Sequence, residues 1–267
     1  MVKQVETSED FGHLGVCLVG SGAIAQDHVA ALEALSVGRF EWVISRRGDA
    51  ASDFAESFGF SNSATSLSEA LRDPAVDLVI ITSPSELHAQ QASECLEAGK
   101  DVIVEIPIGL SYESVDNLLR QGHEKGGRIF VCHTMRSFPA LNHIRNLISE
   151  GSLHVSQVSS VFGIPRRRNQ GSAGTRSWID NLLWHHACHL VDATVWALDS
   201  SEVSQLNALA GRDHPEFGMC MDLGIGFCVD GHIPTLHSLS YNCESLIWEI
   251  RFFGEEQTVV FRNGTLF

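Results

Sequence analysis

Three histidines and an aspartate stand close together in DNLLWHHACHLVD, residues 180–192. On a helix, His185, His189 and Asp192 fall at positions i, i+4 and i+7 and form one stripe. A carboxylate one turn from an imidazole fixes the imidazole tautomer and raises its basicity, and an imidazole exchanges its proton near neutral pH. The stretch therefore predicts a general base, either His189 or His185, with Asp192 in support.

Two other interpretations of the histidine stretch compete with catalysis. Histidines four residues apart can supply two zinc ligands, but no HExxH glutamate and no further ligand cluster is evident, so we expect no metal. A helix whose histidines only fill polar space is the structural alternative. If the stretch is catalytic, its neighbours Trp184 and His186 are predicted to contact the substrate.

An arginine-rich loop precedes the histidine stretch. PRRRNQGSAGTRSW, residues 165–178, contains four arginines in a chain with only 18 Lys and Arg against 33 Asp and Glu. The planar arginine fork binds carboxylates through paired hydrogen bonds, so we expect a small anionic substrate. A solvated loop or a subunit contact is the alternative. The candidate substrate contacts, including one from HTMRSF, are Arg136, Arg166, Arg167, Arg168 and Arg176.

A glycine motif near the amino terminus predicts a nucleotide site. VCLVGSGAIA, residues 16–25, contains Gly-x-Gly-x-x-Ala directly after a short apolar run and at the start of a helical pattern. The first glycine permits a tight turn, the second lets the backbone approach a pyrophosphate, and the helix N-terminus attracts phosphate charge. The predicted cofactor contacts of this loop are Gly20, Gly22, Ala23, Ile24 and Ala25.

The end of the second predicted strand selects between the two nicotinamide cofactors. NAD-binding folds usually have Asp or Glu there, whereas this chain has Ser45, Arg46 and Arg47. Two guanidiniums and a hydroxyl suit a 2′-phosphate. We therefore expect NADP to be preferred over NAD. The alternative is an exposed basic turn balanced by Asp49 and Asp53.

The elements that must position these residues change character along the chain. The first half alternates short apolar runs with helical patterns, which predicts a parallel sheet covered on both faces. Its expected strands are 13–20, 40–45, 76–83, 101–107 and 127–133, and its expected helices are 23–35, 49–58, 86–99 and 111–123. In the second half, helices at 138–150 and 179–198 flank a strand at 153–164. Consecutive strand patterns from residue 202 predict an antiparallel sheet.

The expected fold class is therefore α/β with two domains. The N-terminal Rossmann domain, a doubly wound parallel sheet, is expected over 1–134, with 1–12 as a loose tail. The C-terminal α+β domain, with an open and largely antiparallel sheet, is expected over 135–267. Because an open sheet usually needs a partner, we expect a homodimer or homotetramer assembled through it.

Composition excludes several classes of protein. The net charge of -15 argues against nucleic acid and anionic membranes as partners. No run of about 18 apolar residues could span a membrane, and no apolar run before Val16 indicates a signal peptide. Seven cysteines, an odd number without a CxxC pair, suit reduced thiols, so we expect a cytoplasmic protein.

Longer segments resemble a known family. GSGAIA, TSPSELHAQQASECLEAGKDVIVEIPIGLS and HLVDATVWAL resemble the glucose–fructose oxidoreductase / inositol dehydrogenase / MocA family, over residues 14–262. The resemblance implies a Rossmann domain followed by an open-sheet substrate domain, and hydride transfer between NAD(P) and a hydroxyl carbon. It also implies cofactor contacts on two further loops, from Thr82, Ser83, Pro84, His88, Glu105 and Pro107.

The chain departs from the family pattern in three places. The usual Glu-Lys-Pro reads Glu105-Ile106-Pro107, and the first aspartate of D-x-G-x-H-x-x-D is His185. The third departure is length, since the chain stops at Phe267, before the segment that usually returns to the first domain, so we expect a truncation or a short variant.

Other motifs point to one branch of the family. VEIP, RSWIDNLLWHHACHLVD and HPEFGMCMD are similar to the dehydrogenases of 4-carboxy-2-hydroxymuconate-6-semialdehyde. The resemblance implies oxidation of a cyclic hemiacetal to a pyrone dicarboxylate in aromatic catabolism, with NADP or NAD. A sugar or dihydrodiol dehydrogenase is the alternative within the family, and the missing lysine disfavours it. A non-catalytic nucleotide-binding regulator is the other alternative, which the intact histidine stretch disfavours.

Overall fold

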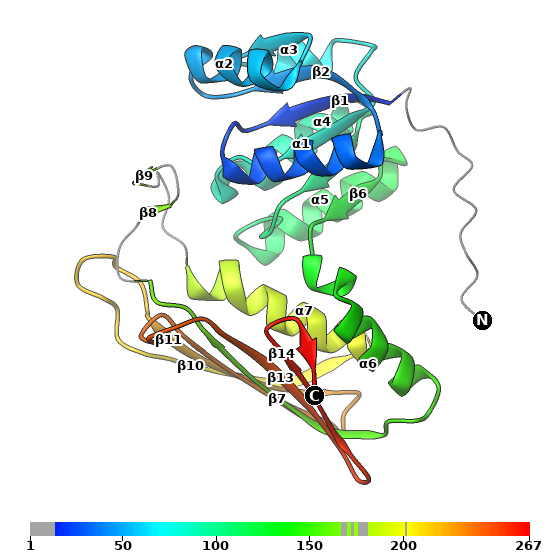
Figure 1. Cartoon of the computed structure of the whole chain (residues 1–267), viewed down its shortest axis with the longest axis vertical. Coiled ribbons are helices and arrows are strands. Elements are labelled where there is room, and N and C mark those ends of the chain that lie inside the picture. Colours follow the sequence, from blue (N-terminus) through cyan, green and yellow to red (C-terminus); the bar gives the residue numbers. More distant parts are fainter. Residues whose placement is uncertain (1–13, 167–169, 172–173, 176–180, 201) are drawn as a thin grey trace. The chain divides into compact units, whose positions relative to one another are not determined.

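The computed structural model describes residues 14–166, 170–171, 174–175, 181–200 and 202–267. The chain divides into two compact units, Met1–Cys132 and His133–Phe267, which are described separately (Figure 1). Within the described residues, no helix combines the length and the apolar character needed to cross a membrane.

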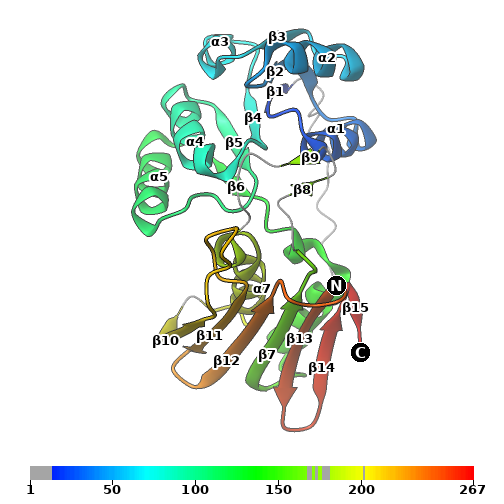
Figure 2. The ribbon, with the colours of Figure 1, turned by 90° about the vertical axis from the view of Figure 1, so that its left-hand side faces the viewer.

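The first unit is built on a parallel sheet, here called sheet A, with strand order β3-β2-β1-β4-β5-β6 (Figure 2). Its strands are β1 (Gly15–Val19), β2 (Arg39–Ile44), β3 (Asn62–Ala64), β4 (Leu78–Ile81), β5 (Asp101–Val104) and β6 (Ile129–Val131). This order is that of the doubly wound nucleotide-binding fold, so the predicted fold class is confirmed. Two short elements were not predicted, β3 and the helix α3 (Leu67–Leu71).

Helices cover both faces of sheet A because its strands are apolar on both sides. Along β1, Val16 and Leu18 join one core cluster and Cys17 and Val19 join the other. The first cluster is completed by α1 (Ala23–Leu35) and α2 (Gly48–Phe58). The second cluster is completed by α3, α4 (His88–Glu97) and α5 (Tyr112–Lys125).

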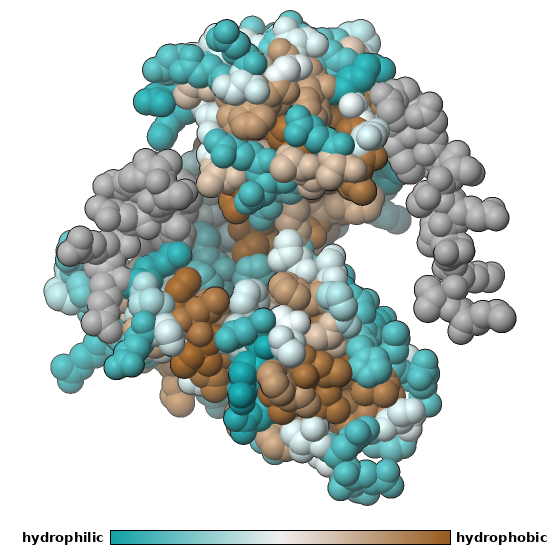
Figure 3. Space-filling model, in the orientation of Figure 1, coloured by the Kyte–Doolittle hydropathy of each residue, from teal (hydrophilic) through white to brown (hydrophobic). Residues whose placement is uncertain are grey.

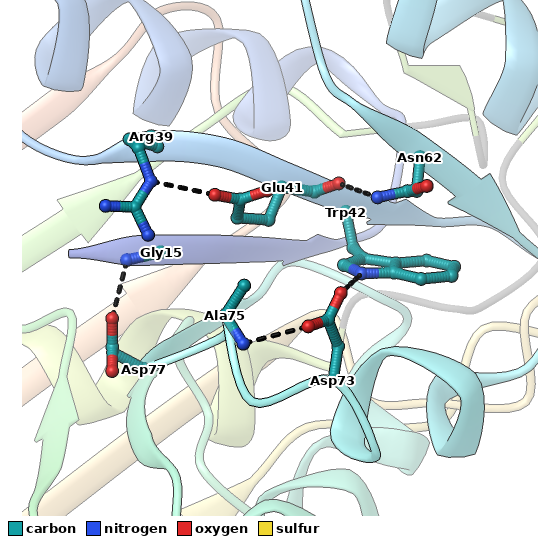
Figure 4. Close-up of polar contacts among 8 residues, drawn as sticks. All are labelled: Gly15, Arg39, Glu41, Trp42, Asn62, Asp73, Ala75 and Asp77. Carbon is teal, nitrogen blue, oxygen red and sulfur yellow. Dashed lines mark hydrogen bonds and ion pairs between the residues drawn. The ribbon is translucent and has the colours of Figure 1, made fainter. Parts of the chain in front are cut away.

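The amino edge of sheet A is closed by hydrogen bonds within the protein (Figure 4). The Gly15 amide donates to Asp77 Oδ2 at 2.7 Å, and the Trp42 indole donates to Asp73 Oδ2 at 2.8 Å. The Trp42 N–H and the Ala75 amide together hold the pKa of Asp73 below its ordinary value. A Cβ on Gly15 would lie 1.6 Å from the Ala75 carbonyl oxygen, so only glycine fits there.

The second unit is built on a seven-stranded sheet, here called sheet B, with order β10-β11-β12-β7-β13-β14-β15. Its strands are β7 (Val155–Gly163), β10 (Val203–Ala210), β11 (Asp222–Val229), β12 (Ile233–Ser240), β13 (Ile247–Gly254), β14 (Thr258–Arg262) and β15 (Thr265–Leu266). Only the pair β12 with β7 is parallel among these strands, so the predicted, largely antiparallel sheet is confirmed. The strands β8 (Gln170–Gly171) and β9 (Gly174–Thr175) form a separate two-stranded sheet.

Helices α6 (Pro139–Ser149) and α7 (Cys188–Ala197) pack on one face of sheet B and form its core with alternate strand residues. Apolar side chains reach the surface in the region of α6 and the last strands (Figure 3), where Phe267 is 66% exposed. On the opposite face of sheet B, Leu236 is 53%, Val161 44% and Ile247 41% exposed. This second face is therefore covered by none of the described helices.

Candidate functional site

The loop between β1 and α1 has the conformation of a phosphate-binding turn. Gly20 has φ +114°, and a Cβ there would lie 2.4 Å from Thr82 Oγ1, so this position requires glycine. A Cβ on Gly22 would meet nothing within 4 Å, which leaves an open cradle beside the backbone. Ala25 is fully buried at the helix–sheet contact. The residues present thus fit a dinucleotide, whose pyrophosphate would occupy the space beside Gly22.

Helix α1 begins directly at this cradle. Gly22 is its N-cap and makes no side-chain capping bond, and Ala23 and Ile24 form its first turn. The Ile24 side chain is 48% exposed, so the first turn is open to solvent. Amide groups at the start of a 13-residue helix favour an anion there.

The end of β2 carries an arginine side chain that could bind an anionic group of a cofactor. The hydroxyl groups of Ser45 and Ser21 lie 3.0 Å apart and join the strand end to the glycine loop. Arg47 Nε lies 3.6 Å from Asp49 Oδ1, and both side chains are exposed. Arg46 is exposed and forms no ion pair within the described residues. The alternative interpretation was an exposed basic turn whose charges are balanced by nearby aspartates. Asp49 does balance Arg47, but the charge of Arg46 has no such partner within the described residues.

The loop after β4 is held by its own polar side chains. The Thr82 hydroxyl donates to the Val19 carbonyl at 3.0 Å, and the Ser83 hydroxyl donates to Gln91 Oε1 at 2.5 Å. Pro84 precedes a short 3-10 turn, Ser85–Leu87, which leads into α4. These bonds fix the loop beside the glycine turn, where Thr82 also limits the space around Gly20.

His88, a predicted cofactor contact, is held between two backbone carbonyls. Its side chain is 2% exposed, with Nδ1 2.8 Å from the Pro107 carbonyl and Nε2 2.7 Å from the Ser83 carbonyl. Carbonyls only accept hydrogen bonds, so the ring donates its N–H to one of them while its other nitrogen faces the second. His88 therefore ties the loop after β4 to the loop after β5, and both ring nitrogens are occupied.

Glu105, directly after β5, has two neighbours that were not predicted. His28 Nε2 lies 2.7 Å from Glu105 Oε1, and Cys132 lies beside the same carboxylate. Burial and then the Glu105 charge raise the pKa of the Cys132 thiol to about 12. The sequence did contain a signal for Cys132, because it follows β6 as Glu105 follows β5, at matching positions of adjacent strands.

In the second unit, the expected helix at 179–198 is not a regular α-helix. Residues Leu183–Ala187 form a π-helical turn, which is followed by α7, and 179–180 lie outside the described residues. A π turn carries one extra residue and is frequent at functional sites. It contains His185, whose Nδ1 lies 3.0 Å from the Asn181 amide nitrogen and 3.2 Å from the Asn181 carbonyl oxygen. His189 lies in α7, with its ring centroid 5.5 Å from that of Trp248 on β13.

Asp192 has two neighbours that the sequence did not indicate. Its carboxylate accepts from Arg136 Nε at 2.9 Å and from Arg136 Nη2, and lies 3.5 Å from His133 Nδ1. Asp192 follows His189 by three residues, so the two side chains point about 60° apart around the helix axis. This angle is enough for them to contact different neighbours. Arg136 thus joins the 3-10 turn Thr134–Ser137 to α7, and its contact with substrate stays a prediction.

A cavity of about 670 Å³ adjoins this ion pair within the second unit. Its walls include His133, Asp192 and Trp196, and the Arg145 guanidinium lies 4.7 Å over the Trp196 ring. Burial lowers the pKa of His133, although the neighbouring Asp192 charge opposes this effect. Burial also raises the pKa of Cys188, on the same wall, to about 12.

The structure describes only part of the predicted substrate contacts. Arg167, Arg168 and Arg176 lie outside the described residues. The Arg166 guanidinium lies 5.6 Å over the ring of Tyr241, and Trp184 is half-buried.

His186 also faces Tyr241, a residue that the sequence did not indicate. The Tyr241 hydroxyl lies 2.8 Å from His186 Nδ1, and the His186 ring lies 4.7 Å from that of Phe162. Tyr241 and Phe162 are both buried in the core of the second unit. These contacts are those of a side chain packed against sheet B, and the predicted contact of His186 with substrate stays a prediction.

Both units match known protein families. Residues 14–133 match the oxidoreductase family with an NAD-binding Rossmann fold, and residues 139–267 match the C-terminal domain of bacterial oxidoreductases. The chain therefore belongs to the glucose–fructose oxidoreductase / inositol dehydrogenase / MocA family of NAD(P)-dependent oxidoreductases.

Individual members of the family are similar to this chain to different degrees. The chain is 38% identical over 229 residues to 4-carboxy-2-hydroxymuconate-6-semialdehyde dehydrogenase from Sphingobium sp. (strain NBRC 103272 / SYK-6), covering 85% of this chain and 72% of that protein. It is 33% identical to scyllo-inositol 2-dehydrogenase (NADP(+)) IolW from Bacillus subtilis (strain 168), over 59% of this chain and 46% of that one. The WlbA dehydrogenase from Bordetella pertussis, solved with NADH and UDP-GlcNAcA, shares the fold. Its TM-score is 0.85 at 21% identity, covering 94% of this chain and 74% of that one.

Proposed function

We propose that this chain is an NADP-preferring dehydrogenase that oxidises a carboxylated cyclic hemiacetal to a pyrone dicarboxylate, as a step of aromatic catabolism. The observation that carries the proposal is the 38% identity, over 85% of the chain, to a dehydrogenase of 4-carboxy-2-hydroxymuconate-6-semialdehyde. The second relative, an inositol dehydrogenase, matches only 59% of the chain. The substrate class of the first relative is therefore favoured over a sugar or inositol.

The first unit supplies the residues that would hold the cofactor. The space beside Gly22 and the uncapped start of α1 suit the pyrophosphate. Arg46, without an ion-pair partner in the described residues, and the Ser45 hydroxyl suit a 2′-phosphate, which supports NADP rather than NAD. When bound, the oxidised nicotinamide accepts the hydride that leaves the substrate carbon.

The second unit supplies the candidate base. Oxidation at the hemiacetal carbon releases the hydroxyl proton, and we assign the removal of this proton to His189. Nδ1 of His185 lies 3.0 Å from the Asn181 amide nitrogen and 3.2 Å from the Asn181 carbonyl oxygen, so this nitrogen is engaged by the backbone, which makes His185 the weaker base candidate. The position of the family lysine holds Ile106, so that side chain has no titratable group.

The base assignment is tested by His189→Asn, which keeps size and polarity but removes the basic nitrogen. Turnover should fall about 10²–10⁴-fold, the usual contribution of a general base, while NADP affinity stays the same. The rise of the wild-type rate with pH should disappear in the variant. His143→Asn, at an exposed position of α6, is the matched control. Wild-type turnover in His189→Asn would refute the assignment, and retained turnover in His185→Asn as well would move the chemistry off this helix.

The substrate class is tested by turnover with the carboxylated ring-cleavage product, with scyllo-inositol and with a dihydrodiol. The proposal requires the first to be the best substrate. Arg166→Gln should raise KM for the dicarboxylated substrate and change KM for its ester much less, since a carboxylate contact is charge-dependent. NADP binding without turnover of any of the three would instead support the regulatory alternative.

Assembly and location are also part of the proposal. The exposed apolar side chains Val161, Leu236 and Ile247 lie on the uncovered face of sheet B, which we propose joins two copies of the chain. Leu236→Lys should then lower the mass measured by sedimentation, whereas Leu35→Lys, at an exposed position of α1, should not. All seven cysteines are free, which supports a reducing compartment such as the cytoplasm.

A further inference from the structure

Three different metal-binding groups converge in the first unit. His28 on α1, Glu105 after β5 and Cys132 after β6 each offer one ligand atom, and these atoms all lie within 4.8 Å of one another. All three residues are half-buried, so the group is neither sealed in the core nor loose on the surface. The arrangement combines a nitrogen, an oxygen and a sulfur donor, which is a ligand set that suits Zn²⁺.

The register of sheet A explains why these side chains meet. Val104 pairs with Val131, and the Cys132 amide donates to the Val104 carbonyl at 2.9 Å, so Glu105 and Cys132 continue two adjacent strands in step. Matched residues of neighbouring parallel strands point to the same face of a sheet. Ile103, two residues before Glu105, packs in the α1 cluster, so this face is the one that α1 covers.

His28 completes the group from above the sheet. It lies beside Val29, which is buried in the same cluster, and its Nε2 is 2.7 Å from Glu105 Oε1. The side chains of His28 and Glu105 remain 20% and 22% exposed. Solvent can therefore reach the ligand atoms, which gives an ion a path to them.

We propose that His28, Glu105 and Cys132 form a binding site for Zn²⁺ or a similar borderline transition-metal ion. Bond lengths of about 2.0–2.3 Å in a tetrahedral site put neighbouring ligand atoms about 3.3–3.8 Å apart. The His28 and Glu105 atoms, now at hydrogen-bond distance, separate by under about 1 Å when an ion enters between them. A water molecule takes the fourth position, because the protein offers three ligands.

An ion pair between His28 and Glu105 does not by itself explain the position of Cys132. The contact between His28 and Glu105 is complete without a thiol, yet Cys132 lies against the same carboxylate. An ion at the centre would link α1, β5 and β6, three segments that lie far apart in the sequence. It would therefore also stabilise the first unit against unfolding, since metal binding adds its free energy to folding.

The test uses the full chain and Co²⁺ as a spectroscopic probe for Zn²⁺. The wild type should bind one ion, with a sulfur-to-cobalt charge-transfer band and strong visible bands of tetrahedral cobalt, both displaced by Zn²⁺. Cys132→Ser should abolish the charge-transfer band and weaken Zn²⁺ binding at least tenfold by calorimetry. His28→Gln should weaken Zn²⁺ binding to a similar degree and keep the charge-transfer band when Co²⁺ is in excess.

Matched controls come from the same chain. Cys243→Ser removes another half-buried free thiol, and His143→Gln removes another histidine, so neither should change Zn²⁺ affinity or the cobalt spectrum. Zn²⁺ should raise the melting temperature of the wild type and of both controls but not that of Cys132→Ser. Absence of Zn²⁺ binding by the wild type, or equal affinity in Cys132→Ser, would overturn the proposal.

Discussion

Glycines at the two edges of sheet A meet opposite surroundings. At the amino edge, a Cβ on Gly15 would lie 1.6 Å from the Ala75 carbonyl, whereas at the carboxyl edge a Cβ on Gly22 would meet nothing within 4 Å. The charged side chains at the two edges also differ in whether the protein itself supplies their partners. Asp73 and Asp77 bind an indole and an amide of the protein itself, while Arg46 has no ion-pair partner among the described residues.

The two edges of sheet A are therefore expected to have different roles, the amino edge in stability and the carboxyl edge in binding. At the amino edge, donors and acceptors satisfy one another and backbone segments touch, so a change there should alter folding first. At the carboxyl edge, space and charge are left over, which is the condition for holding a ligand there. Substitutions at the two edges should therefore move different measured quantities.

The largest effect is expected for Gly15→Ala at the amino edge. A methyl group so close to a backbone oxygen forces strand and loop apart, and overpacking of this kind costs about 3 kcal/mol or more. Thermal unfolding of the full chain measures the loss. Unchanged stability would show that Ala75 can move aside and that this edge is not tightly packed.

At the carboxyl edge, Arg46→Ala should weaken NADP binding about 10- to 150-fold, since a charge-assisted hydrogen bond contributes about 1.5–3 kcal/mol. NAD binding and the melting temperature should hardly change, because Arg46 is exposed. Arg47→Ala, whose partner Asp49 lies on the same turn, serves as the comparison. Equal losses for NADP and NAD would disprove the 2′-phosphate contact.

Gly22→Ala should weaken both cofactors by about tenfold, equivalent to about 1.4 kcal/mol, because its methyl group enters the space for the pyrophosphate. Stability should change by less than about 1 kcal/mol, since the position has an extended backbone and room for Cβ. Fluorescence titration and thermal unfolding of the same sample separate the two quantities. A variant that unfolds like Gly15→Ala would remove the distinction between the edges.

The smallest effect is expected for Trp42→Phe, through Asp73. The Trp42 N–H lowers the pKa of Asp73 in the folded chain, so this contribution to stability is present above the ordinary aspartate pKa. It is lost as the pH falls through the depressed pKa of the folded state. The difference in melting temperature between wild type and variant should therefore be largest near neutral pH and shrink in acid. A difference that is constant with pH would point to packing of the indole instead.

Local patterns were enough to predict much of the first unit. The glycine motif and the helical spacing after it placed α1 at its observed bounds, Ala23–Leu35. Alternating apolar runs likewise indicated β1, β2, β4, β5 and β6. The short elements β3 and α3 carry too few residues for a periodic pattern, which explains why they were missed.

Contacts between segments that are distant in the sequence could not be predicted from local patterns. The packing of His186 depends on Phe162, in β7, and on Tyr241, directly after β12, and neither residue is near His186 in the sequence. Spacing alone placed Asp192 near His189, but the observed partner Arg136 comes from a turn 56 residues earlier. In the same way, the use of both His88 nitrogens depends on a carbonyl 19 residues away.

The central place of β7 in sheet B has a consequence for synthesis of the protein. Its neighbours β12 and β13 begin at Ile233 and Ile247, whereas β7 ends at Gly163. At about 5–20 residues per second, a ribosome needs about 3–14 seconds to make the intervening chain. During that time the nascent β7 has neither of its hydrogen-bonding partners in the sheet. The nascent β7 thus presents unpaired N–H and C=O groups, a condition that favours aggregation, while all strands of sheet A have already been synthesised.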